Sequence, residues 1–125
     1  MDRSVANLVE NYVEAYNARD LEKITNLYTE KAQIEDPVGT DIVLGLEEIE
    51  SFWKNAFSYD MVLKQEGPVF VCGNEAAVGL SVRIKSNDGY EDLPIIIIIT
   101  YTEEKMISSV RSFYDMEAMA RAFKL

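Results

Sequence analysis

The chain has 125 residues, the length of one domain, and 48% of them are apolar, which is enough to form a hydrophobic core. Its 22 acidic and 12 basic residues give a formal net charge of −10, which argues against nucleic acid and anionic membrane surfaces as partners because both repel an acidic protein. With no histidine and no glycine-rich phosphate loop, the sequence lacks Ser-His-Asp and Cys-His catalysis and the usual zinc sites, so we expect no metal and no cofactor.

Helical spacing predicts helices in the first half of the chain. The apolar stripe of the first helix consists of Val5, Leu8, Val9, Tyr12, Val13 and Tyr16. This stretch is amphipathic rather than uniformly apolar, so it is not a signal peptide, and we expect a cytoplasmic protein. Asp20 is placed to cap a short second helix with Tyr28 among its apolar positions. A third helix begins at Gly45 and includes Trp53.

Strands dominate the rest of the chain. A short strand at residues 32–36 ends at Pro37, and further strands are predicted at residues 61–65, 69–72, 76–84, 90–101 and 106–114. Asp115 is placed to cap a final helix at residues 116–123. This order predicts an α+β fold with the helices packed on one face of a curved, mostly antiparallel sheet. No linker or repeat divides the chain, so residues 1–125 are expected to form a single domain.

Isoleucine occupies all five positions from 95 to 99, and such a strand is buried on both faces because apolar and polar residues do not alternate. One face meets the helices, and the other needs a cover, most simply a second copy of the chain. We therefore predict a homodimer through the outer face of the sheet. Pro94 cannot donate to a strand ladder, so it marks an edge or a bulge.

Two apolar segments of the sequence bear on whether the chain spans a membrane and on the state of its cysteine. The longest apolar run, residues 93–99, has seven residues, whereas a membrane-spanning helix needs ~20. Cys72 is the only cysteine and follows Val69, Phe70 and Val71, a setting that predicts a buried thiol.

Asp36 is the strongest candidate for acid–base chemistry. Ile34 and Asp36 share one face of the predicted strand, since side chains two residues apart point the same way. If Ile34 faces the core, Asp36 does too, while Glu35 points away. Pro37 lacks an amide hydrogen, which removes a common local donor. A carboxylate short of donors in an apolar cavity becomes a better base near neutral pH; otherwise Asp36 simply begins a surface turn.

Aromatic side chains form a second group of candidates. Tyr12 and Tyr16 lie one turn apart on the first predicted helix, and a buried phenol can donate a hydrogen bond to a ligand oxygen. Core filling is the alternative for each tyrosine, and for Phe52, Trp53 and Phe57 on the third helix.

The segments around Tyr12 and Asp36 form a wider pattern. Residues 12–21 read YVEAYNARDL, residues 27–29 LYT and residues 34–39 IEDPVG, followed by Gly45 and Phe52-Trp53. In order and spacing they resemble the bacterial ketosteroid isomerase family, within the nuclear transport factor 2-like and SnoaL-like superfamily. The resemblance covers about the first 55 residues and, more loosely, residues 106–114. It implies a cone-shaped fold in which a strongly bent sheet wraps around helices and an apolar pocket lies between them.

The resemblance also implies an activity. The family moves a double bond of a 3-oxo steroid from the β,γ to the α,β position, with an Asp as the base and a Tyr and a protonated Asp donating to the oxyanion. Asp36 falls at the position of the base and Tyr12 at that of the tyrosine. Tyr28 matches a supporting tyrosine, and Trp53 replaces a third. The expected substrate contacts are Tyr28, Trp53, Phe57, Ile96, Ile97 and Tyr114.

The sequence differs from the family pattern at the position of the protonated Asp. Counting forward from Pro94 puts Ile96 at its position, and counting back from residues 106–114 puts Ile97 there. Losing one oxyanion donor costs ~2.7–4 kcal/mol of transition-state stabilisation, roughly a hundredfold to a thousandfold in rate.

Three functions are therefore open. The first is an impaired or altered isomerase acting on an apolar carbonyl compound. The second is a hydrolase or cyclase on the same scaffold, and the third is a module that binds an apolar steroid-, polyketide- or terpenoid-like ligand without changing it.

Overall fold

The structure is a computed structural model that describes residues 4–86 and 89–123. Its helices and strands, in chain order, are α1 (Ser4–Ala18), α2 (Leu21–Thr25), β1 (Tyr28–Glu35), β2 (Val43–Leu44), α3 (Gly45–Ala56), β3 (Met61–Gln65), β4 (Phe70–Cys72), β5 (Glu75–Ser86), β6 (Gly89–Tyr101), β7 (Ile107–Tyr114) and α4 (Met116–Phe123). No helix among these residues is long and apolar enough to cross a membrane.

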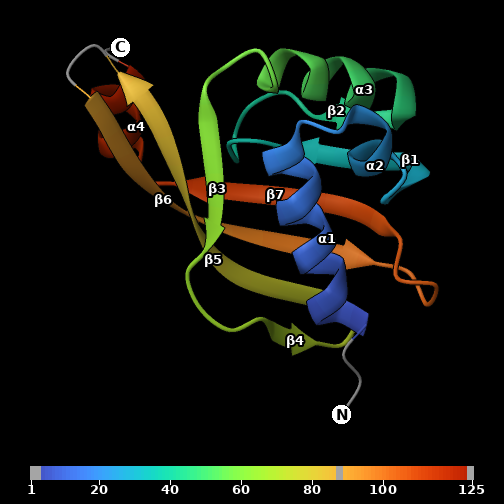
Figure 1. The fold of residues 1–125 in the computed structure, drawn as a ribbon. Coiled ribbons are helices and arrows are strands. Elements are labelled where there is room, and N and C mark those ends of the chain that lie inside the picture. The colour runs from blue at the N-terminus through green and yellow to red at the C-terminus, as the bar shows by residue number, and fades with distance from the viewer. Residues whose placement is uncertain (1–3, 87–88, 124–125) are drawn as a thin grey trace.

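The strands form one curved sheet in the order β2-β1-β7-β6-β5-β3, with β4 paired to β5. Strands β1 and β7 run parallel, and the other pairs are antiparallel. Figure 1 shows α1 crossing one side of the sheet, α2 and α3 near β1, and α4 at the far end of the long β5–β6 hairpin. The predicted α+β fold, with helices on a curved and mostly antiparallel sheet, is confirmed.

The predicted helix starts are also confirmed. The Asp20 carboxylate accepts from the backbone nitrogen of Lys23 at 3.0 Å and caps α2. The Asp115 carboxylate accepts from the second and third residues of α4 at 3.0 and 3.1 Å. Gly45 begins α3 with φ of +85°, in the left-handed region that favours glycine.

The placement of Tyr28 on the second helix is wrong. Helix α2 ends at Thr25, and Tyr28 is the first residue of β1, which begins four residues earlier than predicted. The Ile107 backbone nitrogen donates to the Leu27 carbonyl at 2.7 Å, and Tyr28 pairs with Ile107 in the parallel ladder. Pairing with a strand distant in sequence therefore overrides the local helical spacing.

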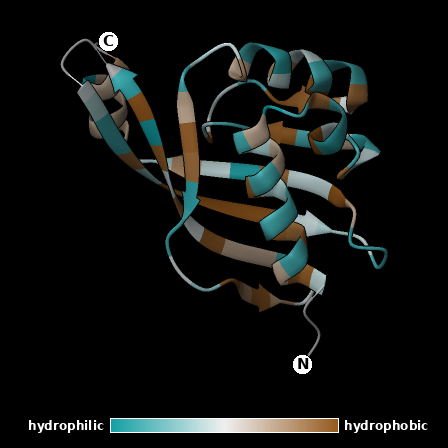
Figure 2. Ribbon diagram, viewed as in Figure 1, coloured by the Kyte–Doolittle hydropathy of each residue, from teal (hydrophilic) through white to brown (hydrophobic). Residues whose placement is uncertain are grey.

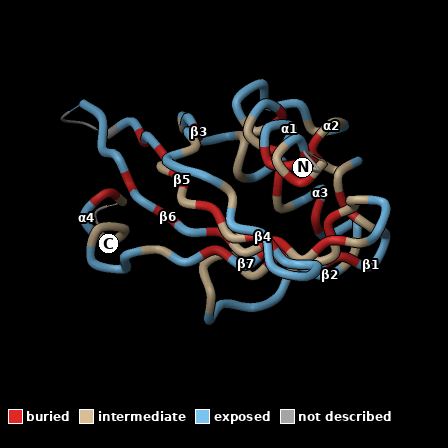
Figure 3. Tube along the Cα trace, turned by 90° about the horizontal axis from the view of Figure 1, so that it is seen from below, coloured by how far each residue is buried: buried red, intermediate tan, exposed pale blue. Residues whose placement is uncertain are grey.

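The isoleucine run of β6 has one buried and one open face in the single chain. Ile95, Ile97 and Ile99 are buried, whereas Ile96 is 53% exposed. Figure 2 shows the run as a continuous hydrophobic stretch of β6, and Figure 3 shows buried residues gathered between the helices and the middle of the sheet. Pro94 lies just before the first β6–β7 pair, Ile95 with Tyr114, so the predicted edge at Pro94 is confirmed.

The prediction of a buried Cys72 thiol is wrong. Cys72 is exposed, as are its neighbours Phe70 and Val71. Strand β4 is short, pairs only with the first residues of β5 and lies at the margin of the sheet. Apolar residues next to Cys72 in the sequence therefore do not ensure that its thiol is buried.

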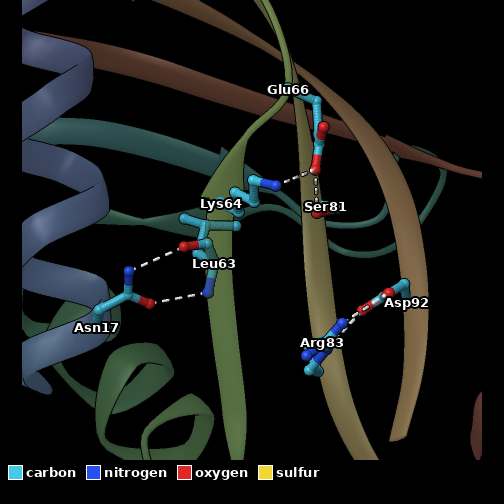
Figure 4. A network of polar contacts seen from close by, with 7 residues as sticks. All are labelled: Asn17, Leu63, Lys64, Glu66, Ser81, Arg83 and Asp92. Atoms are coloured by element: carbon cyan, nitrogen blue, oxygen red, sulfur yellow. Dashed lines mark hydrogen bonds and ion pairs between the residues drawn. The ribbon is translucent and has the colours of Figure 1, made fainter.

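Two side chains at the end of α1 fasten β3 to the helix. The Asn17 side chain donates to the Leu63 carbonyl and accepts from the Leu63 backbone nitrogen, both at 2.8 Å (Figure 4). Arg19 donates to the carbonyls of Phe57, Tyr59 and Met61 at 2.9–3.3 Å. These bonds fix the outer strand of the sheet beside the apolar space described next.

Candidate active site

A cavity of about 250 Å³ lies between α1, α3, α4 and the sheet. Its apolar walls include Leu63, Leu80, Val82, Leu93, Ile95 and Ile97. Asp36 is the only charged side chain among the described residues that line it. A more open hollow beside β2 and α3 is lined in part by Glu30, Glu47 and Glu48. These three side chains are exposed, so their carboxylates are solvated.

Strand β1 aims Asp36 at this cavity by simple alternation. Ile34 is buried in the core, Glu35 faces outward, and Asp36 lines the cavity directly after the strand ends. Glu35 accepts from Arg111 Nε and from the Gly39 backbone nitrogen, both at 3.0 Å. The Asp36–Pro37 peptide bond is cis. The predicted opposite orientations of Glu35 and Asp36 are confirmed.

The surroundings of Asp36 disfavour its charged form. Burial raises its pKa above the ordinary value, while hydrogen bonding from the side chains of Tyr114 and Ser112 opposes the rise. Among the described residues, no lysine or arginine contributes to this balance. A carboxylate that is desolvated and has no counter-ion in the described part of the chain gains proton affinity.

Tyr12 and Tyr16 reach the cavity from α1. Burial, followed by charges that include Asp36, raises the pKa of Tyr12 well above its ordinary value. Burial and the Asp36 charge raise the pKa of Tyr16 to about 12. Both phenols therefore stay protonated at neutral pH and are available as hydrogen-bond donors. The Tyr16 hydroxyl donates to Met61 Sδ over a long distance, 3.9 Å.

Trp53 holds these tyrosines in place. Its ring meets Tyr12 and Tyr16 edge-on, at centroid distances of 5.8 and 5.7 Å. Tyr28 was predicted to contact substrate but is not among the residues that line the cavity, and its hydroxyl lies near Trp53 and Tyr12. Neither that hydroxyl nor Trp53 Nε1 completes a hydrogen bond with any residue that the structure describes. These aromatic side chains are therefore closely packed, but two of their polar atoms have no hydrogen-bond partner among the described residues.

The remaining predicted contacts separate into two groups. Trp53, Ile97 and Tyr114 line the cavity, whereas Phe57 packs against Trp53 at 5.5 Å outside the lining. Ile96 points to the outer face of the sheet. The residue that stands where a second acid would face the cavity is therefore Ile97, and the placement of Ile96 in the pocket is wrong because the strand alternation turns it away.

Several lining residues were not predicted from sequence. Met119 and Phe123 close the cavity from α4, and Met61 reaches it from β3. Ser112 is also part of the lining, and it is the only fully buried polar residue in the part of the chain that the structure describes. The signal for Ser112 was available, because it lies two residues from Tyr114 on the same face of β7.

No group of three or more Asp, Glu, Cys or His side chains that could hold a metal ion occurs among residues 4–86 and 89–123. The lining also offers no cluster of basic side chains for a phosphate-bearing cofactor.

Comparisons with known proteins agree with this architecture. The family model of the SnoaL-like domain matches residues 9–119. The chain is 29% identical over 114 residues to a steroid Delta-isomerase of Nocardioides simplex, covering 91% of this chain and 92% of that protein. It has a TM-score of 0.84 and 24% identity with SalBIII, described as an epoxide hydrolase/cyclase-like enzyme in pyran ring formation in the polyether salinomycin, over 93% and 94% of the two chains.

The structural match shows a shared fold, and the family match extends from α1 through the sheet into α4. The chain therefore belongs to the SnoaL-like domain family, within the nuclear transport factor 2-like superfamily.

Proposed function

We propose that this protein is a cofactor-independent isomerase that moves a β,γ double bond into conjugation with a ketone. The observation that carries the proposal is the lone carboxylate of Asp36, which lies in an apolar cavity beside the Tyr12 and Tyr16 phenols. The similarity to the Nocardioides simplex isomerase along most of both chains supports it. The substrate class is an apolar carbonyl compound of steroid, polyketide or terpenoid type.

The chemistry is an internal proton transfer. Asp36 removes a proton from the carbon between the ketone and the double bond, and the C–H electron pair delocalises into a dienolate. Tyr12 donates a hydrogen bond to the ketone oxygen, where the negative charge collects. Asp36 then returns the proton to the γ carbon, which leaves the double bond conjugated with the ketone. No net proton, electron or group is exchanged with solvent.

The electrostatics suit both roles. A raised pKa makes Asp36 a stronger base once it is ionised. The strongly raised pKa of Tyr12 keeps its phenol neutral, so that it donates a hydrogen bond to the dienolate rather than repelling it.

Ile97 weakens the proposed site. Its side chain is 1% exposed and lines the cavity, but it cannot donate to an oxyanion. With one donor fewer, we expect turnover roughly a hundredfold to a thousandfold below that of a site with two donors. The same residue favours the second candidate function, a module that binds an apolar ligand without changing it.

A hydrolase or cyclase is the third candidate, and the fold shared with SalBIII supports it. In this reaction Asp36 takes the proton of a water or a substrate hydroxyl that attacks an electrophilic carbon.

We further propose that the functional form is a cytoplasmic homodimer. Ile96 pairs with Phe113 on the outer face of the sheet, where they are 53% and 38% exposed. An open apolar surface of this kind is suited to a second copy of the same face. Light scattering should give twice the chain mass for the wild type, and Ile96→Lys should shift it toward the monomer.

One assay tests the isomerase against the binding module. The protein is mixed with a β,γ-unsaturated 3-oxo steroid, and the ultraviolet band of the conjugated product is followed for the wild type and Asp36→Asn. Turnover that is lost in Asp36→Asn supports the isomerase. Binding without turnover in either protein supports the binding module. Turnover that survives in Asp36→Asn contradicts the role proposed for Asp36.

A further inference from the structure

The two strands that flank Asp36 bring side-chain hydroxyls to it. Glu35 pairs with Arg111 in the parallel β1–β7 ladder, so the next residue of each strand, Asp36 and Ser112, are neighbours. The Val38 backbone nitrogen donates to the Ser112 carbonyl at 2.8 Å and holds the chain beyond Asp36 against β7. Tyr114 follows two residues later on the same face, and both Ser112 and Tyr114 line the cavity.

Ser112 is unusual in this chain because it is polar and yet only 1% exposed. A buried hydroxyl is costly unless it makes a hydrogen bond. Hydrogen bonding from the Tyr114 phenol and then from the Ser112 hydroxyl lowers the pKa of Asp36, which burial raises, so both hydroxyls act on this carboxylate. Burial and the Asp36 charge keep the pKa of Tyr114 far above neutral, so this phenol donates in its neutral form.

We propose that Ser112 and Tyr114 are positioning residues, whose two hydroxyls hold the Asp36 carboxylate and direct it toward substrate in the cavity. The inference rests on the isomerase function proposed above. A carboxylate has about four acceptor positions, so two hydroxyl donors leave room for the proton that it removes. Ser112 lies directly across from Ile97 in the β6–β7 ladder. Because Ile97 faces the cavity, this register places the Ser112 side chain on the cavity face of β7 as well.

The other titratable groups that face Asp36 are phenols. Tyr12 and Tyr16 come from α1 and Tyr28 from β1, and burial, with a smaller contribution from the Asp36 charge, raises the pKa of each. Glu35 points away, to Arg111. A change in the titration of Asp36 after removal of a hydroxyl is therefore not confused with the titration of a nearby acid or base.

The first measurement is independent of activity. The 13C signal of the Asp36 carboxyl is followed against pH in the wild type, Ser112→Ala and Tyr114→Phe. Each variant removes a donor to the charged form, so the titration midpoint should rise by about one pH unit. Ser108→Ala and Tyr101→Phe are matched controls, because their hydroxyls bond to the carbonyls of Thr100 and Gly73. Unchanged midpoints in both test variants would overturn the proposal.

The second measurement distinguishes an effect of the two hydroxyls on the orientation of the Asp36 carboxylate from an effect on its pKa alone. Loss of a donor makes Asp36 a stronger base, which alone would raise kcat at high pH. If the hydroxyls also direct the carboxylate, kcat at high pH should fall about tenfold, with the acid limb of the pH profile moved upward and KM changed less than twofold. A kcat that stays level or rises would overturn the positioning role. A wild type with no turnover contradicts the proposed function, and the carboxyl titration then still decides whether the hydroxyls hold Asp36.

Discussion

Glu35 and Asp36 are adjacent acids at the end of one strand, and the two faces of β1 give them opposite properties. Glu35 is oriented outward, where the Gly39 backbone nitrogen and then Arg111 lower its pKa. Asp36 is oriented inward, where burial raises its pKa and no cation among the described residues lowers it. A difference of one residue, amplified by strand alternation, thus separates a surface ion pair from a candidate base.

The comparison shows how the side chain on the outer face of β1 stabilises the segment that carries the buried acid. The outer acid holds the 35–39 turn through its bond to Gly39 and fastens β1 to β7 through Arg111. The inner acid is therefore carried by a segment that is fixed from the opposite side. Desolvation of Asp36 is tolerated because its backbone and its neighbour are firmly held.

The largest expected effect tests this contrast directly. Asp36→Asn should lower kcat for a β,γ-unsaturated ketone by about 10²–10⁴-fold, since it removes the general base. Glu35→Gln should stay within about twofold of the wild type, because its side chain does not reach the cavity. Initial rates from the absorbance of the conjugated product measure both. Equal losses in the two variants would show that the two faces are not functionally distinct.

A second test concerns Tyr12, the proposed donor to the ketone oxygen of the substrate. Tyr12→Phe should reduce kcat by about 10²–10³-fold with little change in KM, because the lost hydrogen bond forms with charge that develops in the transition state. Tyr101→Phe is the matched control, since its hydroxyl bonds to the Gly73 carbonyl away from the cavity. A parallel loss in KM would indicate that Tyr12 acts in ground-state binding instead.

The third test uses the same alternation on another strand. Ile97→Asp places an acid that burial keeps protonated on the inner face of β6, and should increase kcat by up to about 100-fold, although at some cost in stability. Ile96→Asp places the same group on the outer face, away from the cavity, and should not increase kcat. Both variants are checked for folding by circular dichroism before rates are compared. An equal gain in both would argue against a specific donor position at Ile97.

The sequence was sufficient wherever a local rule decides the structure. Alternation in β1 predicted the orientations of Glu35 and Asp36, and side-chain caps predicted the starts of α2 and α4. It failed where distant segments decide. Tyr28 joins β1 because β7 pairs with it, and Cys72 is exposed because nothing in the described chain covers β4.

The candidate site shows the same division. Asp36, Tyr12 and Trp53 were found from spacing and resemblance, and all three line the cavity. Ser112 was missed although it shares a face of β7 with Tyr114, because only the β1–β7 register shows that it lies next to Asp36. Met119 and Phe123 were missed because their contribution depends on where α4 folds back, which periodicity does not determine.

The smallest expected effects are on stability, and they should differ in sign for the two acids. A folded-state pKa above the unfolded one means that Asp36 destabilises the fold increasingly as pH rises from its unfolded pKa through its folded pKa. The lowered pKa of Glu35 means that its stabilisation is present above its unfolded pKa and is lost as pH falls through its folded pKa. At about pH 7, Asp36→Asn should therefore raise the urea midpoint and Glu35→Gln should lower it. As the pH falls, the Asp36 difference should shrink toward zero below the unfolded pKa of Asp, about 3.9, whereas the Glu35 difference should shrink only below the lowered folded pKa of Glu35. Shifts of the same sign at neutral pH would mean that the two faces of β1 do not impose opposite environments, and the contrast on which the candidate site depends would be lost.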